Sequence, residues 1–143
     1  MKMKSLLTLA LTLAFGCTAV FAAEEEPTPL EKEMKIMNKS LRALKKQVAD
    51  TTKKEDNMAL IATIKKSLEA SMKLEPAKTK DVPAAEKAAY LDKYKAQMTD
   101  LGKTYDELET AIKADKADEV KKALDKLSEQ KEKGHKDFAP EEK

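Results

Sequence analysis

The sequence predicts an all-α protein, an antiparallel up-down-up-down four-helix bundle that follows a cleaved signal peptide. Four segments repeat apolar residues at spacings of three and four, the period of an amphipathic helix. No segment alternates apolar and polar residues between turn residues, as a half-buried strand does. Only 3 of the 143 residues are glycine, and the links between the four segments are short. Short links make each helix fold back against its neighbour, which is typical of an up-down bundle.

The first 22 residues have the pattern of a secretory signal peptide. Lys2 and Lys4 give a basic start, and Leu6 to Phe15 is an apolar run too short to span a bilayer. Val20 to Ala22 fits the small-residue cleavage rule, so we expect cleavage after Ala22 and a mature domain of residues 23–143. The alternative is cleavage and lipidation at Cys17, although the residue three before that cysteine is smaller than lipoprotein signals usually carry.

The charge and cysteine content of the mature chain excludes several classes of function. Without Lys2 and Lys4 the basic count falls from 28 to 26, which equals the 26 acidic residues, so no basic excess favours nucleic acid. The only cysteine lies in the signal segment, so the mature chain has no disulfide and no Cys-x-x-Cys-His motif for covalent haem. We expect a monomer with no stable membrane association.

The first two predicted helices have recognisable starts. Thr28 is the expected N-cap of the first, with Pro29 at the first helical position and Glu31 completing a capping box. Its apolar stripe is Leu30, Met34, Met37, Leu41, Leu44 and Val48. Thr52 and Glu55 predict a second capping box that opens the second helix, which we expect to end at Pro76. Its stripe is Met58, Ile61, Ile64, Leu68 and Met72.

The third and fourth predicted helices follow the longest connection, residues 77–83, with an expected entry at Asp81-Val82-Pro83. The third stripe is Leu91, Tyr94, Met98, Leu101, Tyr105, Leu108 and Ile112. Gly102 interrupts it at a cost of ~1 kcal/mol relative to alanine, for which close approach to a neighbouring helix is one reason. Asp115 is the expected cap of the fourth helix, which Pro140 ends. The fourth stripe is Ala117, Val120, Leu124, Leu127, Lys131, His135 and Phe138.

Such a bundle brings the start of its first helix and the end of its fourth to the same end of the molecule. Met34 and His135, the only histidine, would then face each other across the core. A thioether and a neutral imidazole are a ligand pair for a haem iron. Each has an ordinary interpretation as well, since stripe methionines usually fill cores and a lone histidine near a chain end usually lies at the surface. Met37, one turn from Met34, is a rival for the ligand role.

These two residues stand in segments that resemble the cytochrome b562 family. The resemblance covers most of the mature chain and is clearest in Leu30-Glu31-Lys32-Glu33-Met34. It returns from Ala111 to Phe138, where a tight turn precedes a Lys/Ala/Glu-rich helix ending in His-Lys-x-aromatic, with the family's spacing from Leu127 to His135. The resemblance implies a periplasmic b-type cytochrome with one non-covalent haem b (iron protoporphyrin IX) per chain, which exchanges single electrons with an unidentified redox partner protein.

The resemblance also implies a role for each site residue. Met34 would be the sixth and His135 the fifth ligand of the iron. The expected haem contacts are Met37, Leu41, Tyr94, Met98, Leu101 and Lys131, the last for a propionate. The chain departs from the family pattern at Gly134, where a larger residue is usual, and at Lys131, where arginine is more typical and would make a forked contact.

The chemistry of the chain favours electron transfer and not an enzyme. The mature chain has no second histidine, no cysteine and no glycine-rich phosphate loop. Protein ligands at both axial positions would leave no open site on the iron. Two alternatives stay open: a haem-free periplasmic bundle that binds a partner protein or unfolded chains, and a copper(I) site of Met34, Met37 and His135.

Overall fold

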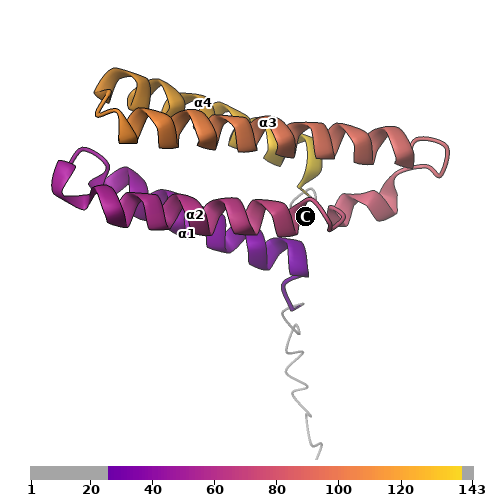
Figure 1. Cartoon of the computed structure of the whole chain (residues 1–143). Helices are drawn as coiled ribbons and strands as arrows, with labels where there is room; N and C mark the ends of the chain where they lie inside the picture. The colour runs from indigo at the N-terminus through magenta and orange to yellow at the C-terminus, as the bar shows by residue number, and fades with distance from the viewer. Residues whose placement is uncertain (1–25, 140–143) are drawn as a thin grey trace, which may run out of the picture.

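A computed structural model describes residues 26–139, which form an antiparallel four-helix bundle (Figure 1). The helices are α1 (Pro29–Gln47), α2 (Lys54–Ser71), α3 (Lys87–Lys113) and α4 (Ala117–Phe138), with short 3-10 helices η1 (Thr51–Lys53) and η2 (Ala77–Asp81) between them. No strand occurs in residues 26–139, so the predicted fold class is confirmed. The expected signal peptide, with Cys17, and Pro140 lie outside these residues.

The core is built from the apolar stripes of all four helices. Its most deeply buried large side chains are Leu44, Ile61, Ile64, Leu108 and Leu127. They come from every helix, so each helix buries its stripe only in the presence of the others. Within residues 26–139, no helix is long and apolar enough to cross a membrane.

Gly102 lies at a close contact between α3 and α2. A β-carbon at this position would lie 3.2 Å from Leu68 Cδ2, tighter than an ordinary van der Waals contact. The missing side chain therefore lets α3 approach α2, and this explains a glycine that the helical pattern alone disfavours.

The start of α1 is as predicted, and the start of α2 is not. The Glu31 amide donates to Thr28 Oγ1 (3.2 Å) and the Thr28 amide to the Glu31 carboxylate (2.6 Å), which completes the capping box. The capping box expected at Thr52 is wrong. Asp50 caps η1 by accepting from the amide (2.9 Å) and hydroxyl (2.6 Å) of Thr52, and α2 begins at Lys54 with no side-chain cap. The Asp50 carboxylate takes the Thr52 amide and hydroxyl as its donors and closes a local turn around Thr52.

Asp115 ends α3 and does not cap α4, so this prediction is also wrong. Its φ is 55°, the left-handed conformation common just after a helix. The Lys116 amide donates to the Ala111 carbonyl (3.0 Å) and the Asp115 amide to the Ile112 carbonyl (3.2 Å), a Schellman motif. The Lys54 ammonium donates to the Asp115 carboxylate (2.9 Å) and the Lys113 carbonyl (2.8 Å), which fastens α2 to this end of α3.

Three other helix details differ from the predictions. α2 ends at Ser71, before Pro76, and α3 begins at Lys87, several residues after Asp81-Val82-Pro83. On α4, Ala117 is exposed, because it lies in the first turn at the end of the bundle. Ala123 is buried instead, one turn before Leu127 on the side that faces the core.

Candidate functional site

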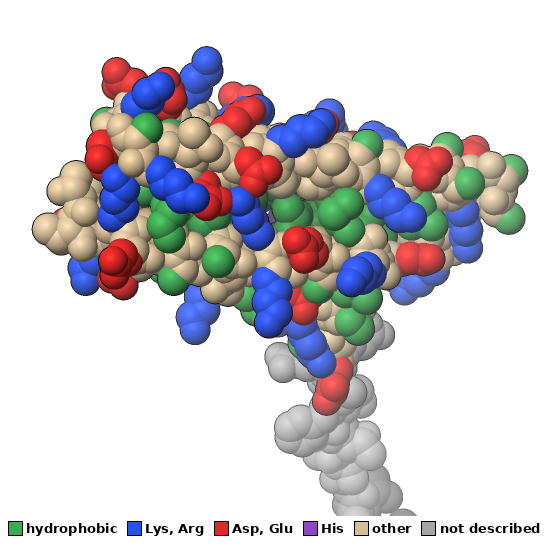
Figure 2. Space-filling view, viewed as in Figure 1, with side chains coloured by type: hydrophobic (Ala, Val, Ile, Leu, Met, Phe, Trp, Pro, Cys, Tyr) green, Lys and Arg blue, Asp and Glu red, His purple; other side chains and the backbone are tan. Residues whose placement is uncertain are grey.

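The bundle is open between its first and last helices. α1 packs closely on α2, and α3 on α4, but the backbones of α1 and α4 seldom come close to each other. Between them lies a pocket of about 1070 Å³, slightly larger than the usual ligand-binding cavity of about 300–1,000 Å³. Figure 2 views the other side of the molecule, with α2 and α3 toward the viewer, and there hydrophobic side chains show along the groove between the two layers of helices.

All eight residues that sequence reasoning assigned to a site line this one pocket. They are Met34, Met37 and Leu41 of α1, Tyr94, Met98 and Leu101 of α3, and Lys131 and His135 of α4. Met37, Leu41, Tyr94 and Met98 are buried, whereas Met34, Leu101 and Lys131 are half-buried. Stripe residues from distant parts of the chain meet here because α1 and α4 run antiparallel and their ends lie together.

His135 is exposed where it borders the pocket. Among residues 26–139 its ring has no hydrogen-bond partner, so neither ring nitrogen is occupied by a contact with the described protein. An imidazole in this state can act as a ligand without first breaking a contact.

Contacts to α3 hold the end of α4 that carries His135. Asp137 accepts from Gln97 Nε2 (2.5 Å) and pairs with the Lys93 ammonium (3.2 Å). These partners, Gln97 first, hold the pKa of Asp137 below its usual range. Phe138 packs edge-on against Tyr90 and Tyr94, with ring centroids 5.2 and 5.3 Å apart. His135 therefore stands on a helix end held by two polar contacts of Asp137 and two aromatic contacts of Phe138.

Tyr94 forms a rigid part of the pocket wall. Its hydroxyl donates to the Ser71 carbonyl (2.9 Å) at the end of α2. Burial raises the pKa of Tyr94 to about 12, so the phenol is neutral under ordinary conditions. The bond to α2 satisfies the one polar atom of the ring and leaves an apolar face for the pocket.

Gln130 is a pocket residue that sequence reasoning missed. Its side-chain oxygen is buried and has no hydrogen-bond partner among the described residues. Buried acceptors are nearly always hydrogen-bonded in native proteins, so this oxygen is available to a donor that enters the pocket. No signal in the sequence singles out Gln130, since it reads as one of many polar residues on α4. Gln97 and Asp137 were missed for the same reason.

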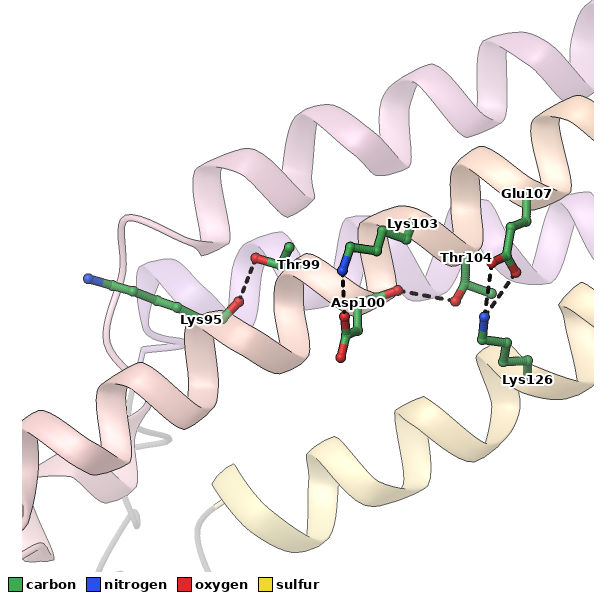
Figure 3. A network of polar contacts seen from close by, with 7 residues as sticks. All are labelled: Lys95, Thr99, Asp100, Lys103, Thr104, Glu107 and Lys126. Atoms are coloured by element: carbon green, nitrogen blue, oxygen red, sulfur yellow. Dashed lines mark hydrogen bonds and ion pairs between the residues drawn. The ribbon is translucent and has the colours of Figure 1, made fainter.

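On its α3–α4 side, the rim of the pocket has more positive than negative side chains that are free of ion pairs among the described residues. Asp100 borders the pocket, but its carboxylate accepts from Lys103 (3.1 Å), and its carbonyl accepts from Thr104 (3.1 Å; Figure 3). On the same face Lys126 joins α4 to Glu107 of α3 at 2.9 Å (Figure 3). Lys131 and Lys133 also border the pocket and form no ion pair within residues 26–139.

The thioether and imidazole donors of the pocket are soft or borderline metal ligands. Among the described residues, no group of three or more His, Cys, Asp or Glu side chains is placed to hold a metal ion. The pocket instead offers the thioethers of Met34, Met37 and Met98 and the imidazole of His135. This set suits an iron porphyrin or a monovalent copper ion and not a hard cation such as magnesium or calcium.

Comparison with known proteins identifies the family. The family model described as "Cytochrome b562" matches residues 29–139, which include all four helices and all eight pocket residues named above. No curated protein and no solved structure is significantly similar to the chain. Because the match extends over most of the sequence, the chain belongs to the cytochrome b562 family.

Proposed function

We propose that this protein is a monomeric periplasmic electron carrier that binds one b-type haem non-covalently in the pocket between α1, α3 and α4. Its family already indicates a haem-binding electron-transfer cytochrome. One observation carries the more specific proposal. An apolar pocket of about 1070 Å³ is bordered both by Met34 and by His135, which lie a hundred residues apart in sequence.

The residues of the pocket fit a haem group. His135 supplies an uncommitted imidazole, and Met34 a half-buried thioether. A bound haem would supply a reversible one-electron change at its iron. With Met34 and His135 both holding the iron, the soft sulphur of Met34 would favour its reduced form relative to a second imidazole, and the two protein ligands would favour electron exchange over binding of oxygen or substrate.

The other pocket residues hold the macrocycle and exclude water. Met37, Leu41, Tyr94 and Met98 are buried and provide an apolar wall, with Leu101 beside them. Lys131 is available to a haem propionate as a single charged donor, although lysine lacks the forked geometry of arginine. Binding energy from these contacts adds to that of the two ligands.

Absorption spectra of haem-loaded variants test the ligand assignment. We expect His135→Ala to weaken haem binding most. Met34→Ala keeps haem but changes its spin state, because one axial position opens. Met37→Leu is the matched control, since it removes the rival thioether and leaves the shape of the buried site similar. Unchanged spectra in both the His135 and the Met34 variants would refute the assignment, and uptake of copper(I) without haem would favour the copper alternative.

Chemical protection of the single histidine gives a second test. His135 is exposed in the described structure, so diethylpyrocarbonate is expected to modify it readily in the haem-free protein. Iron ligation occupies a ring nitrogen, so one equivalent of haem is expected to slow the reaction strongly. The Met34→Ala variant with haem is the control, because it keeps His135 ligated. Equal reaction rates with and without haem would contradict the proposal.

A further inference from the structure

Helix α1 has a line of positive charges that the other helices lack. Its basic stripe, defined as Lys32, Lys35, Lys39, Arg42 and Lys46, repeats at spacings of three and four and therefore follows one side of the helix. All five side chains are exposed. No acidic residue occurs between Met34 and Ala49.

The basic stripe has no acidic partners within residues 26–139. Every ion pair found there involves a lysine outside the stripe. On α4, by contrast, Lys121 pairs with Asp125 (2.7 Å) one turn away and Lys126 with Glu107 of α3 (2.9 Å). Like charges one turn apart destabilise a helix, so the described fold gains nothing from this arrangement.

The position of the stripe relates it to the pocket. The buried residues of α1, Met37, Leu41 and Leu44, occupy the opposite side of the helix, so the stripe faces solvent. Lys35 belongs to the stripe and also borders the pocket. From Lys32 to Lys46 the stripe extends about 21 Å along the helix. A partner seated on it would therefore lie beside the mouth of the pocket.

We propose that the basic stripe is a docking surface for an acidic face of a partner protein. Under the proposed function that partner is an electron-transfer protein, whose docking here brings it next to the pocket mouth. Complementary charge steers such encounters and speeds association. Ile36 is 41% exposed and one turn from both Lys32 and Lys39, so it supplies an apolar contact within the surface.

The composition of α1 favours a protein partner over a lipid surface. A helix that lies on a bilayer needs apolar side chains beside its basic ones to enter the lipid. The apolar side of α1 is buried in the bundle core, and Ile36 is the one large hydrophobic exposed in the described structure.

The test compares two variants with the same change in net charge. The stripe variant carries Lys35→Glu, Lys39→Glu and Arg42→Glu. The control variant carries Lys66→Glu, Lys73→Glu and Lys95→Glu, three exposed lysines on α2, the segment after it and α3 that form no ion pair in the described structure. Far-UV circular dichroism and thermal melting check that both variants fold. In the stripe variant the new glutamates at positions 35 and 42 lie one turn from Lys32 and Lys46, which offsets part of their repulsion with the glutamate at position 39.

The probe is fluorescently labelled poly-L-glutamate, an acidic polypeptide, and the readout is its anisotropy with haem-free and haem-loaded protein. We expect the stripe variant to bind at least ~10-fold more weakly than the wild type at low salt, and the control variant to differ by less than ~3-fold. Higher salt weakens wild-type binding. The haem-free measurement makes this result independent of whether the pocket binds haem.

Three results would overturn the docking proposal. The first is equal weakening in both variants, which would mean that net charge alone attracts the probe. The second is no binding by the wild type. The third is stripe-dependent binding to phosphatidylglycerol vesicles that is tighter than binding to poly-L-glutamate at the same salt concentration, which would assign the stripe to a membrane surface.

Discussion

Replacing Gly134 with alanine is expected to stabilise the helix end that carries His135. A β-carbon at position 134 would have Gln97 Oε1 as its nearest neighbour, at 3.9 Å, so alanine fits without moving any atom. Alanine is favoured over glycine by ~1 kcal/mol inside a helix, and we expect ~0.5–1 kcal/mol here because little more than one turn of α4 follows. For a domain of this size that is a rise in melting temperature of ~2–5 °C.

The matched control for Gly134→Ala is Gly102→Ala, which makes the same substitution in the interior of α3, where the gain in helix propensity is at least as large. Its β-carbon would meet Leu68 Cδ2 at 3.2 Å, and Leu68 is buried between α2 and α3. Displacing it costs packing energy, so we expect no stabilisation and a loss of up to ~1 kcal/mol. Urea unfolding of the haem-free proteins, followed by far-UV circular dichroism, measures both. Equal stabilisation by the two alanines, or destabilisation by Gly134→Ala, would refute the packing argument.

Three further predictions concern the core, a wall residue and a helix end. Leu108 is fully buried, so Leu108→Ala is expected to lower the unfolding free energy by ~3 kcal/mol, and a urea titration showing a loss under ~1 kcal/mol would contradict the described packing. The folded-state pKa of Tyr94 is about 12, above its ordinary value of 10.0, so the stability that it contributes is complete below pH 10 and is lost as the pH rises toward 12. Tyr94→Phe is expected to show a smaller decline in unfolding free energy over this range, and an identical decline would contradict the assignment. Because the φ of Asp115 is 55°, thermal melts are expected to show Asp115→Gly close to wild type and Asp115→Val destabilised by ~1–2 kcal/mol; equal effects would mean that this backbone conformation is not maintained.

Some features of the site could be predicted because they depend on helix period and topology. The stripes place Met34 and His135 at particular turns of the first and last helices, and antiparallel packing brings those turns to the same end. All eight residues chosen on this basis and on the family resemblance line one pocket. Gln97, Gln130 and Asp137 were not predicted, because a polar residue on a helix reveals its role only once its neighbour from another helix is known.

The helix ends likewise include some that the local sequence predicts and some that depend on the folded chain. The capping box of Thr28 and Glu31 is complete within four residues, so its sequence is sufficient to predict it. At Asp50 and Thr52 two possible caps compete, and at Asp115 the local Schellman motif is joined by an ion pair with Lys54, 61 residues away. Such choices depend on which hydrogen bonds the folded chain can form together.

By itself the sequence determined the helical class, the four apolar stripes, the first helix start and the unbroken line of positive charge on α1. These follow from contacts between residues within a turn or two of one another. Only the tertiary structure decided that the bundle opens between α1 and α4, that Gly102 serves close packing on Leu68 and that contacts to α3 hold the end of α4. Helix period indicates which side of a helix is buried, but the separation of two helices depends on the side chains that both bring to their contact.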